Sequence, residues 1–363
     1  MANVVIESKG KPIPDATLHG YLAEGARTNL ITYSEQFDNA AWVKDSGNIS
    51  ADTMLAPDGK SSADSFIEDT TTNVHDIHPS LSVSIGTTYT ASIYAKSKSG
   101  NRYILASGMG LISAGYYITY DLSNGTVTNV GGGGTGATYS IQSVGNGWYR
   151  CIVTFTAMST LYPIWNLNNT FITNNIYQGD GTSGIYLWGA QLEVGAFASS
   201  YIPTTTASVT RNAEIKTDIV LSNIDINKGS IYLEFIPNHV VSGTVFMFGS
   251  YVDTNNYTAI LHDATNLIFR KRITGTNYDA TIALTYVNGT SYKISATWGA
   301  SGTTIYLNGG AGTPHANITA LQLAATFQLG SDGNSLQHLY GTVRNVKIWK
   351  KALTDTQLIN LTK

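Results

Sequence analysis

The sequence has little cysteine, little charge and no long apolar run, and each shortage excludes a class of protein. Cys151 is the only cysteine in 363 residues, so no disulfide can form within the chain and packing must hold the fold. No run of 18 apolar residues is present, so we expect no membrane insertion. The first thirty residues contain Glu7, Lys9, Lys11 and Asp15 but no apolar core, so we expect no signal peptide and synthesis in the cytoplasm.

Charged residues are also scarce. They make up 12% of the chain and its formal net charge is −3, whereas soluble proteins average roughly 25% charged residues. Binding to a phosphate backbone or an anionic membrane requires clustered lysine and arginine. We therefore expect no nucleic-acid partner.

What the sequence does contain is a recurrent period of two. Tyr149, Cys151, Val153 and Phe155 alternate with other residues in one run, and Ile231, Leu233 and Phe235 do so in another, as in half-buried strands. Asn-Gly and Asp-Gly pairs between such runs favour tight hairpins. The pattern predicts an all-β protein of two tandem antiparallel β-sandwiches.

Composition divides the chain into four segments. Residues 1–26 are rich in glycine and proline and predict an arm that attaches the protein to a larger assembly, with a partly disordered terminus as the alternative. Residues 27–203 and 218–363 are the two predicted sandwiches. Residues 204–217 are polar and threonine-rich, which favours a linker between them.

The end of the chain predicts a short helix. Thr354 and Gln357 have the spacing of a capping box, in which the threonine hydroxyl accepts from the Gln357 amide while the Gln357 side chain reaches back. Leu358 and Leu361 then fall on one helical face. The sequence thus predicts a capped helix after the last strand.

Four motifs in the C-terminal half stand in the order of a known family. They are Tyr292-Lys-Ile-Ser-Ala-Thr-Trp, Thr304-Ile-Tyr-Leu-Asn-Gly, Phe327-Gln-Leu-Gly-Ser and the ending that starts at Gly341-Thr-Val-Arg. With them, residues 218–363 resemble the laminin-G-like, concanavalin-like jelly roll. The resemblance implies a binding module that presents its loops to a ligand.

The N-terminal half carries different motifs. They are Glu24-Gly-Ala-Arg-Thr-Asn-Leu, Val144-Gly-Asn-Gly-Trp-Tyr-Arg-Cys and Ile185-Tyr-Leu-Trp-Gly-Ala-Gln-Leu-Glu. With them, residues 24–203 resemble a module of bacteriophage virion proteins that is itself similar to carbohydrate-binding jelly rolls. The resemblance implies a non-catalytic structural protein on the virion surface, in a tail or head fibre or as a decoration.

Such a protein would contact other virion proteins and a host cell-surface glycan. We expect it to form a homo-oligomer, with a trimer favoured. The alternative is a purely architectural decoration or cement protein that binds no sugar.

Glycan recognition needs an aromatic ring that stacks on the apolar face of a sugar, and amide or carboxylate groups that bond its hydroxyls. Two regions combine these elements, although a buried core position is the alternative for each ring. The candidate glycan-binding residues are Trp165, Asn168, Tyr177, Asp180, Tyr251, Asn255 and Tyr257.

Catalytic and metal signatures are weak. No pair of acids alternates along one strand as in concanavalin-like hydrolases, and no Gly-x-Ser-x-Gly or His-Glu-x-x-His motif occurs, so we expect no enzyme activity. His75 and His78 could ligate a metal, but a polar loop is the favoured interpretation. The candidate calcium ligands are Glu35, Asp38 and Glu193, with three solvated carboxylates as the alternative.

Overall fold

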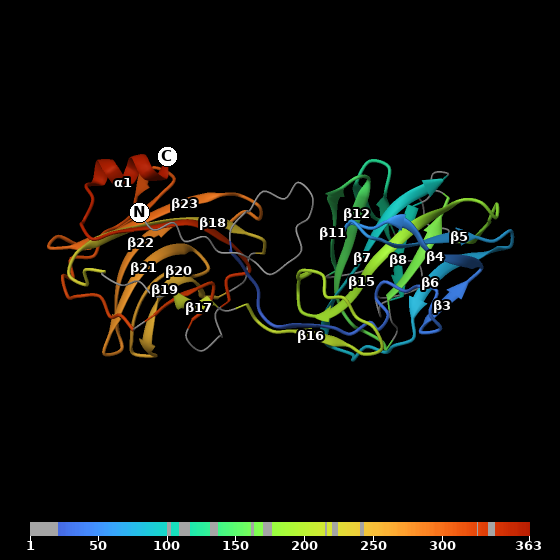
Figure 1. The fold of residues 1–363 in the computed structure, drawn as a ribbon, viewed down its shortest axis with the longest axis horizontal. Coiled ribbons are helices and arrows are strands. Elements are labelled where there is room, and N and C mark those ends of the chain that lie inside the picture. Colours follow the sequence, from blue (N-terminus) through green and yellow to red (C-terminus); the bar gives the residue numbers. More distant parts are fainter. Residues whose placement is uncertain are drawn as a thin grey trace. The chain divides into compact units, whose positions relative to one another are not determined.

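The computed structural model describes residues 21–99, 103–108, 117–130, 137–160, 163–169, 176–214, 216–219, 224–239, 243–324, 326–332 and 338–363. These residues form two compact units, and each unit is a sandwich of antiparallel sheets (Figure 1). The predicted all-β class is confirmed. No helix in the described residues has the length and apolar character needed to cross a membrane.

The first sandwich lies within Arg27–Arg211. Across one sheet the strands run in the order β10 (Thr126–Val130), β9 (Tyr117–Asp121), β8 (Tyr103–Gly108), β13 (Pro163–Asn168), β6 (Thr72–Pro79) and β14 (Ile176–Gln178), and β3 (Trp42–Asp45) also pairs with β6. Across the other sheet the order is β11 (Thr138–Gly145), β12 (Trp148–Thr156), β7 (Thr88–Ser99), β15 (Gly184–Val194), β5 (Ser61–Glu68) and β4 (Gly47–Leu55).

The core of the first sandwich lies between these sheets. Cys151, Val153 and Phe155 point into it with no exposed surface, as the alternation predicts. From the other sheet, β13 contributes Trp165, which packs near Tyr120 and is only 1% exposed. The prediction that Trp165 binds a glycan is therefore wrong and its buried alternative is correct, because its strand directs that side chain into the core.

The chain enters and leaves the first sandwich through a two-stranded ribbon. β2 (Arg27–Asn29) pairs with β16 (Val209–Arg211), so Arg27 lies directly opposite Arg211. Thr204, in the predicted linker, is buried and donates its hydroxyl to the Ile31 carbonyl. The linker prediction for residues 204–217 is thus wrong, because residues 204–211 belong to the first sandwich and the chain leaves it after Arg211.

The second sandwich contains residues from both ends of the chain. One sheet has the order β1 (Tyr21–Ala23), β27 (Gly341–Trp349), β18 (Gly229–Pro237), β23 (Tyr292–Gly299), β24 (Gly302–Leu307) and β25 (Gly310–Ala311). The other has the order β17 (Lys216–Ile219), β26 (Phe327–Leu329), β19 (Val245–Asp253), β20 (Asn256–His262), β21 (Asn266–Ile273) and β22 (Thr276–Ala283).

Strand β1 corrects the predicted N-terminal arm. It pairs with β27 from Tyr21↔Val343 to Ala23↔Gly341, and the Ala23 side chain is fully buried in the second core. Residues 21–26 therefore belong to the C-terminal sandwich, and the first sandwich is inserted between them and residue 212. The rest of the predicted arm, residues 1–20, lies outside the described residues.

The second core and the C-terminal helix form as predicted. Ile231, Leu233 and Phe235 of β18 are buried together. Helix α1 (Asp355–Thr362) begins with the predicted capping box, and both of its hydrogen bonds are present, between Thr354 and Gln357. Leu358 anchors α1 to the sheet through Tyr306, on the side away from the main core (Figure 1).

We predict that Trp165→Ala destabilises the first sandwich by about 3–5 kcal/mol, because the truncation leaves a cavity in a closed core. Urea unfolding followed by circular dichroism measures this loss. Trp349→Ala is the matched control, since Trp349 is only partly buried beside α1, and it should cost clearly less. Equal stability of Trp165→Ala and the parent protein would contradict the core position.

We also predict that Thr354→Ala lowers the stability of the C-terminal sandwich by about 1 kcal/mol, because one amide of the first helical turn loses its acceptor. Thr356→Ala, at an exposed position inside the same helix, serves as the control and should change stability by less than about 0.5 kcal/mol. Both values come from the urea midpoint of the C-terminal transition. A larger loss for Thr356→Ala than for Thr354→Ala would show that the cap contributes nothing.

Candidate functional site

Two tyrosines lie side by side at the end of the β19–β20 hairpin. The antiparallel register places Tyr251 directly opposite Tyr257. Their rings are stacked, with centroids 5.7 Å apart and planes inclined by 19°. Both side chains are partly exposed, so the pair forms a small aromatic surface that we call the tyrosine platform.

The turn beside the platform is held by its own side chains. Asp253 Oδ1 accepts from the Asn255 amide at 2.7 Å, and the Asn256 side chain donates to both carboxylate oxygens of Asp253. Asn256 Oδ1 also accepts from the Thr274 amide in the next hairpin, at 3.0 Å. Because two turns are joined in this way, the platform rests on a fixed backbone.

The platform lies on the face of its sheet that points away from the main core. Along β20, Ile260 packs into that core, whereas Tyr257 and Ala259 belong to a separate cluster with Phe246. Tyr251 shares the face of Tyr257 because the two residues are cross-strand partners. The alternation of β20 therefore separates the residues of the main core from a second buried cluster, at whose end Tyr257 is partly exposed.

Charged and amide groups continue this face across β21 and β22. Arg272 is the cross-strand partner of Tyr257, and its Nη1 donates to Asn277 Oδ1 at 2.8 Å. Arg270 binds Asp279 through two hydrogen bonds of 2.9 and 2.7 Å. Asp279, and secondarily the Tyr257 hydroxyl, hold the pKa of Arg270 above its usual range. Arg270 therefore stays charged at any ordinary pH, and its hydrogen bonds to Asp279 fix the edge of the platform.

This arrangement offers a flat aromatic surface bordered by donors and acceptors at its edge. A pyranose presents an apolar C–H face and a rim of hydroxyls, which need those two kinds of partner. Asn255 and Asn277 are exposed at the border. The structure thus brings together three predicted residues, Tyr251, Asn255 and Tyr257, in one hairpin.

Three of the other four predicted glycan-binding residues are buried. Trp165 and Asn168 have at most 1% exposure, and Tyr177 has 9%. The Tyr177 hydroxyl donates to Glu68 at 2.7 Å while its ring packs on His75. Asp180 is exposed, but Ser183 and Thr182 donate to it and hold its pKa well below the usual range. The predictions for Trp165, Asn168 and Tyr177 are corrected, because these side chains are buried. Asp180 organises a turn, and its role in glycan binding stays a prediction.

The structure reveals a polar row that the sequence analysis missed. Asp76 on β6 lies between Asp45 on β3 and Asn166 on β13, each its direct cross-strand partner. Asn166 Nδ2 donates to Ser107 Oγ of the next strand at 2.7 Å. The sequence did contain a signal for this row, since side chains alternate along a strand. If Trp165 of β13 points inward, Asn166 must point to the opposite face.

The two histidines of β6 are also separated by alternation. The segment is a strand and not the polar loop that we favoured from the sequence. His75 Nδ1 and Nε2 contact the Ser46 and Tyr177 carbonyls, at 2.6 and 3.2 Å. His78 lies beside Asp76, on the same face, and its Nε2 is 3.9 Å from Asp45 Oδ2. The two imidazoles therefore cannot ligate one ion together.

Burial shifts the pKa values in this row. Removal from water, with the Asp45 charge beside it, raises the pKa of Asp76 to about 7. Removal from water lowers the pKa of His78. Both shifts disfavour the charged form, as expected for groups that lose hydration.

The predicted calcium ligands do not come together in the described part of the chain. Glu193 is buried and pairs with Arg27 at 3.3 Å. Burial raises the pKa of Glu35, which hydrogen-bonds Tyr201, and Asp38 is exposed. Among the described residues, the cluster with metal-ligand geometry is instead Asp45, Asp76 and His78.

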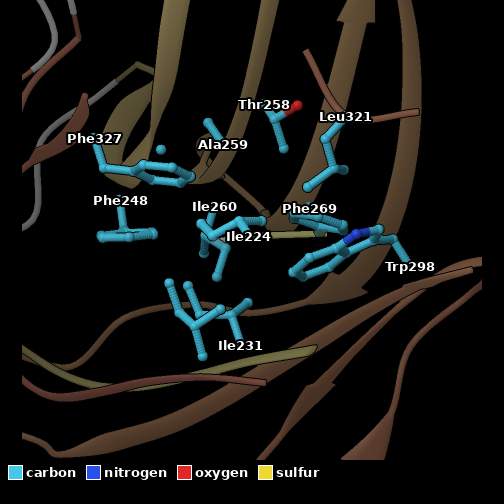
Figure 2. A pocket seen from close by; sticks show the side chains of 12 residues that line it. Ile224, Ile231, Phe248, Thr258, Ala259, Ile260, Phe269, Trp298, Leu321 and Phe327 are labelled. Carbon is cyan, nitrogen blue, oxygen red and sulfur yellow. The ribbon is translucent and has the colours of Figure 1, made fainter. Parts of the chain in front are cut away.

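An apolar pocket lies inside the second sandwich and is not a binding site for a sugar. Phe248, Phe269, Phe327 and Trp298 point into it from the two sheets (Figure 2). Its volume is about 20 Å³, room for about one water molecule. A hydroxyl-rich ligand would find neither the space nor hydrogen-bond partners there.

Comparison with known protein families gives a match for the C-terminal half of the chain. The family described as the concanavalin A-like lectin/glucanases superfamily matches residues 209–359. No curated protein matches the chain.

The solved structures that the chain matches are distant in sequence. Domain 4 of an extracellular arabinanase from Geobacillus stearothermophilus, in complex with arabinotriose, has 19% identity and a TM-score of 0.34 over 38% of this chain and 67% of that one. The CBM40 domain of the Ruminococcus gnavus IT-sialidase, bound to alpha2,3 sialyllactose, has 13% identity and a TM-score of 0.32 over 38% and 84%. Domains LG4-5 of the mouse laminin alpha1 chain have 11% identity and a TM-score of 0.29 over 96% of each chain.

The family match covers the sandwich that carries the tyrosine platform. The resemblance of the C-terminal half, first drawn from its four motifs, is confirmed by that match: residues 209–359 are similar to the concanavalin A-like lectins and glucanases.

Proposed function

We propose that the C-terminal sandwich binds a glycan at the tyrosine platform and leaves it chemically unchanged. The observation that carries the proposal is the parallel, partly exposed pair Tyr251–Tyr257 on the outer face of the sheet. The superfamily matched by this half includes lectins, which supports the same assignment.

Stacking and hydrogen bonds at the platform would fix the orientation of a bound sugar. A pyranose stacked on the outer ring of the pair buries its C–H face, and its hydroxyls then reach the border of the platform. Asn255 and Asn277 can both donate to and accept from hydroxyl groups there. Asp279 already neutralises Arg270, whereas Arg272, opposite Tyr257, donates to the neutral Asn277 amide and keeps a charged donor at the border.

The chemistry of the platform favours binding over hydrolysis. Cleavage of a glycosidic bond requires two carboxyl groups about 5–10 Å apart on either side of the bond. At the platform, Asp279 is committed to Arg270, and Asp253 is committed to Asn255 and Asn256. Neither carboxylate is placed to donate a proton or to attack.

We further propose that the chain acts on the surface of a bacteriophage virion, as a homo-oligomer with a trimer favoured, and that the glycan lies on the host cell. The motifs of residues 24–203 support this, since they resemble a module of phage virion proteins. Repeated copies would turn weak single sites into firm attachment by raising the effective concentration.

A purely architectural role is the second candidate. The same aromatic pair could pack against a neighbouring subunit, because tyrosines are enriched in protein interfaces as well as in sugar sites. A protein of this kind would bind no glycan, and the platform would be covered in the assembled particle.

We predict that Tyr257→Ala and Tyr251→Ala each weaken glycan binding by about tenfold or more, because loss of one stacked ring removes roughly 1.4 kcal/mol. The measurement is glycan-array binding of the full chain, followed by calorimetry with the strongest glycan found. Tyr139→Ala is the control, since Tyr139 is an exposed tyrosine of the first sandwich. Binding that persists in the platform variants but is lost with Tyr139→Ala would refute the site.

The virion proposal predicts that an antibody against this chain labels intact particles released by lysis, at sites repeated by the particle symmetry. Negative-stain electron microscopy with gold-labelled antibody makes the test. If the antibody labels particles but the chain binds no glycan on any array, the architectural role would be favoured. Absence of the chain from purified particles would refute both virion roles.

A further inference from the structure

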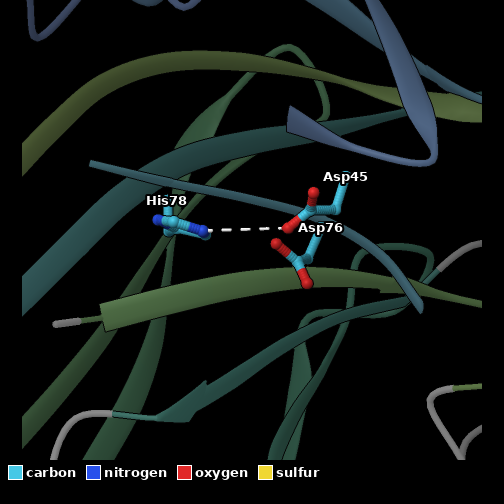
Figure 3. Close-up of side chains that lie close together, drawn as sticks. All are labelled: Asp45, Asp76 and His78. Carbon is cyan, nitrogen blue, oxygen red and sulfur yellow. Dashed lines mark ion pairs between the residues drawn. The ribbon is translucent and has the colours of Figure 1, made fainter. Parts of the chain in front are cut away.

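Three ligand-type side chains meet on β3 and β6 in the first sandwich. The antiparallel register pairs Asp45 with Asp76, and His78 follows two residues after Asp76 on the same face. One side-chain ligand atom from each residue lies within 4.8 Å of the other two (Figure 3). Two neighbouring strands, and not a flexible loop, therefore set the geometry of this cluster.

The Asp76 carboxylate lacks hydrogen-bond and charge compensation at this position. Its side chain is 8% exposed, and its Oδ1 atom is buried without a hydrogen-bond donor. Among the described residues no lysine or arginine forms an ion pair with it, whereas the nearby carboxylate of Asp45 adds negative charge. A buried carboxylate without donor or counter-charge is costly, and a bound cation would remove that cost.

We propose that Asp45, Asp76 and His78 bind one divalent transition-metal-type ion, with zinc as the best chemical match. Two carboxylate oxygens and one imidazole nitrogen are a ligand set that suits zinc. Calcium prefers six to eight oxygen ligands, so three groups that include an imidazole fit it poorly. This site is separate from the tyrosine platform and does not depend on the proposed function.

The three ligand atoms, which lie within 4.8 Å of one another, must move closer together to hold one ion. In a tetrahedral site with bonds of about 2.0–2.1 Å, neighbouring ligand atoms lie roughly 3.3 Å apart. His78 Nε2 and Asp45 Oδ2 are 3.9 Å apart. The Asp45 side chain is 57% exposed, so it can rotate toward the ion while the buried members stay in place. The open side of Asp45 also leaves a position for a water ligand.

The ion would act structurally. β3 is a four-residue strand that pairs only along β6 in the described sheet. An ion held by Asp45 of β3 and by two residues of β6 would join this short strand to the sheet. Since the ion would bind the folded state, it should raise the unfolding temperature in proportion to the logarithm of its concentration.

The test is calorimetric titration of the full chain, without a histidine tag and after treatment with a chelator, using Zn²⁺ alone. We expect one ion per chain and a higher unfolding temperature. Co²⁺ should give the visible absorption bands of a tetrahedral nitrogen–oxygen site. Asp45→Asn, Asp76→Asn and His78→Gln should each weaken Zn²⁺ binding by about tenfold or more.

Asp58→Asn is the matched control. It removes the same charge from the same sandwich, at a turn residue paired with Lys60, and should leave Zn²⁺ binding unchanged. Asp45→Asn decides the question if the buried variants fail to fold, because Asp45 is exposed. The absence of saturable binding, or binding that all three substitutions leave intact, would overturn the proposal. Displacement of Zn²⁺ by an equal concentration of Ca²⁺ would overturn the choice of metal.

Discussion

Neighbouring side chains along a β-strand point to opposite faces of the sheet, and every surface of this protein depends on that constraint. In β13 it directs Trp165 into the core and Asn166 to the opposite face. In β20 it directs Ile260 inward and Tyr257 outward. One strand therefore contributes its alternate residues to two different surroundings, the main core on one face and a second cluster or a polar row on the other.

Pairing between distant segments gives the chain its domain organisation. β2 and β16 lie side by side although about 180 residues separate them, so the first sandwich closes on itself between Arg27 and Arg211. β1 in turn completes a sheet of the C-terminal sandwich beside β27. A domain whose ends are adjacent can be inserted into another without breaking its core. Each sandwich consequently keeps its own hydrophobic core and its own polar surfaces.

The two candidate sites would bind their ligands through different physical effects. The tyrosine platform is partly exposed, and its neighbour Arg270 is already paired with Asp279, so it would gain free energy by covering apolar ring surface. The Asp45–Asp76–His78 cluster includes a buried carboxylate oxygen that lacks a donor, so it gains by acquiring charge compensation. The first arrangement suits weak, reversible recognition, and the second suits firm retention of an ion.

Local patterns in the sequence determined the all-β class, the core residues of β12 and β18, and the capping box at Thr354, because each depends on the spacing of residues along one element. The tertiary structure alone decided which strands become neighbours. It placed Tyr251 against Tyr257 in one hairpin, but it buried Trp165 and Tyr177 and brought Asp45 to Asp76 across two strands. It also assigned residues 21–26 to the C-terminal sandwich. Burial and cross-strand proximity are properties of paired segments, and the period of a single segment does not contain them.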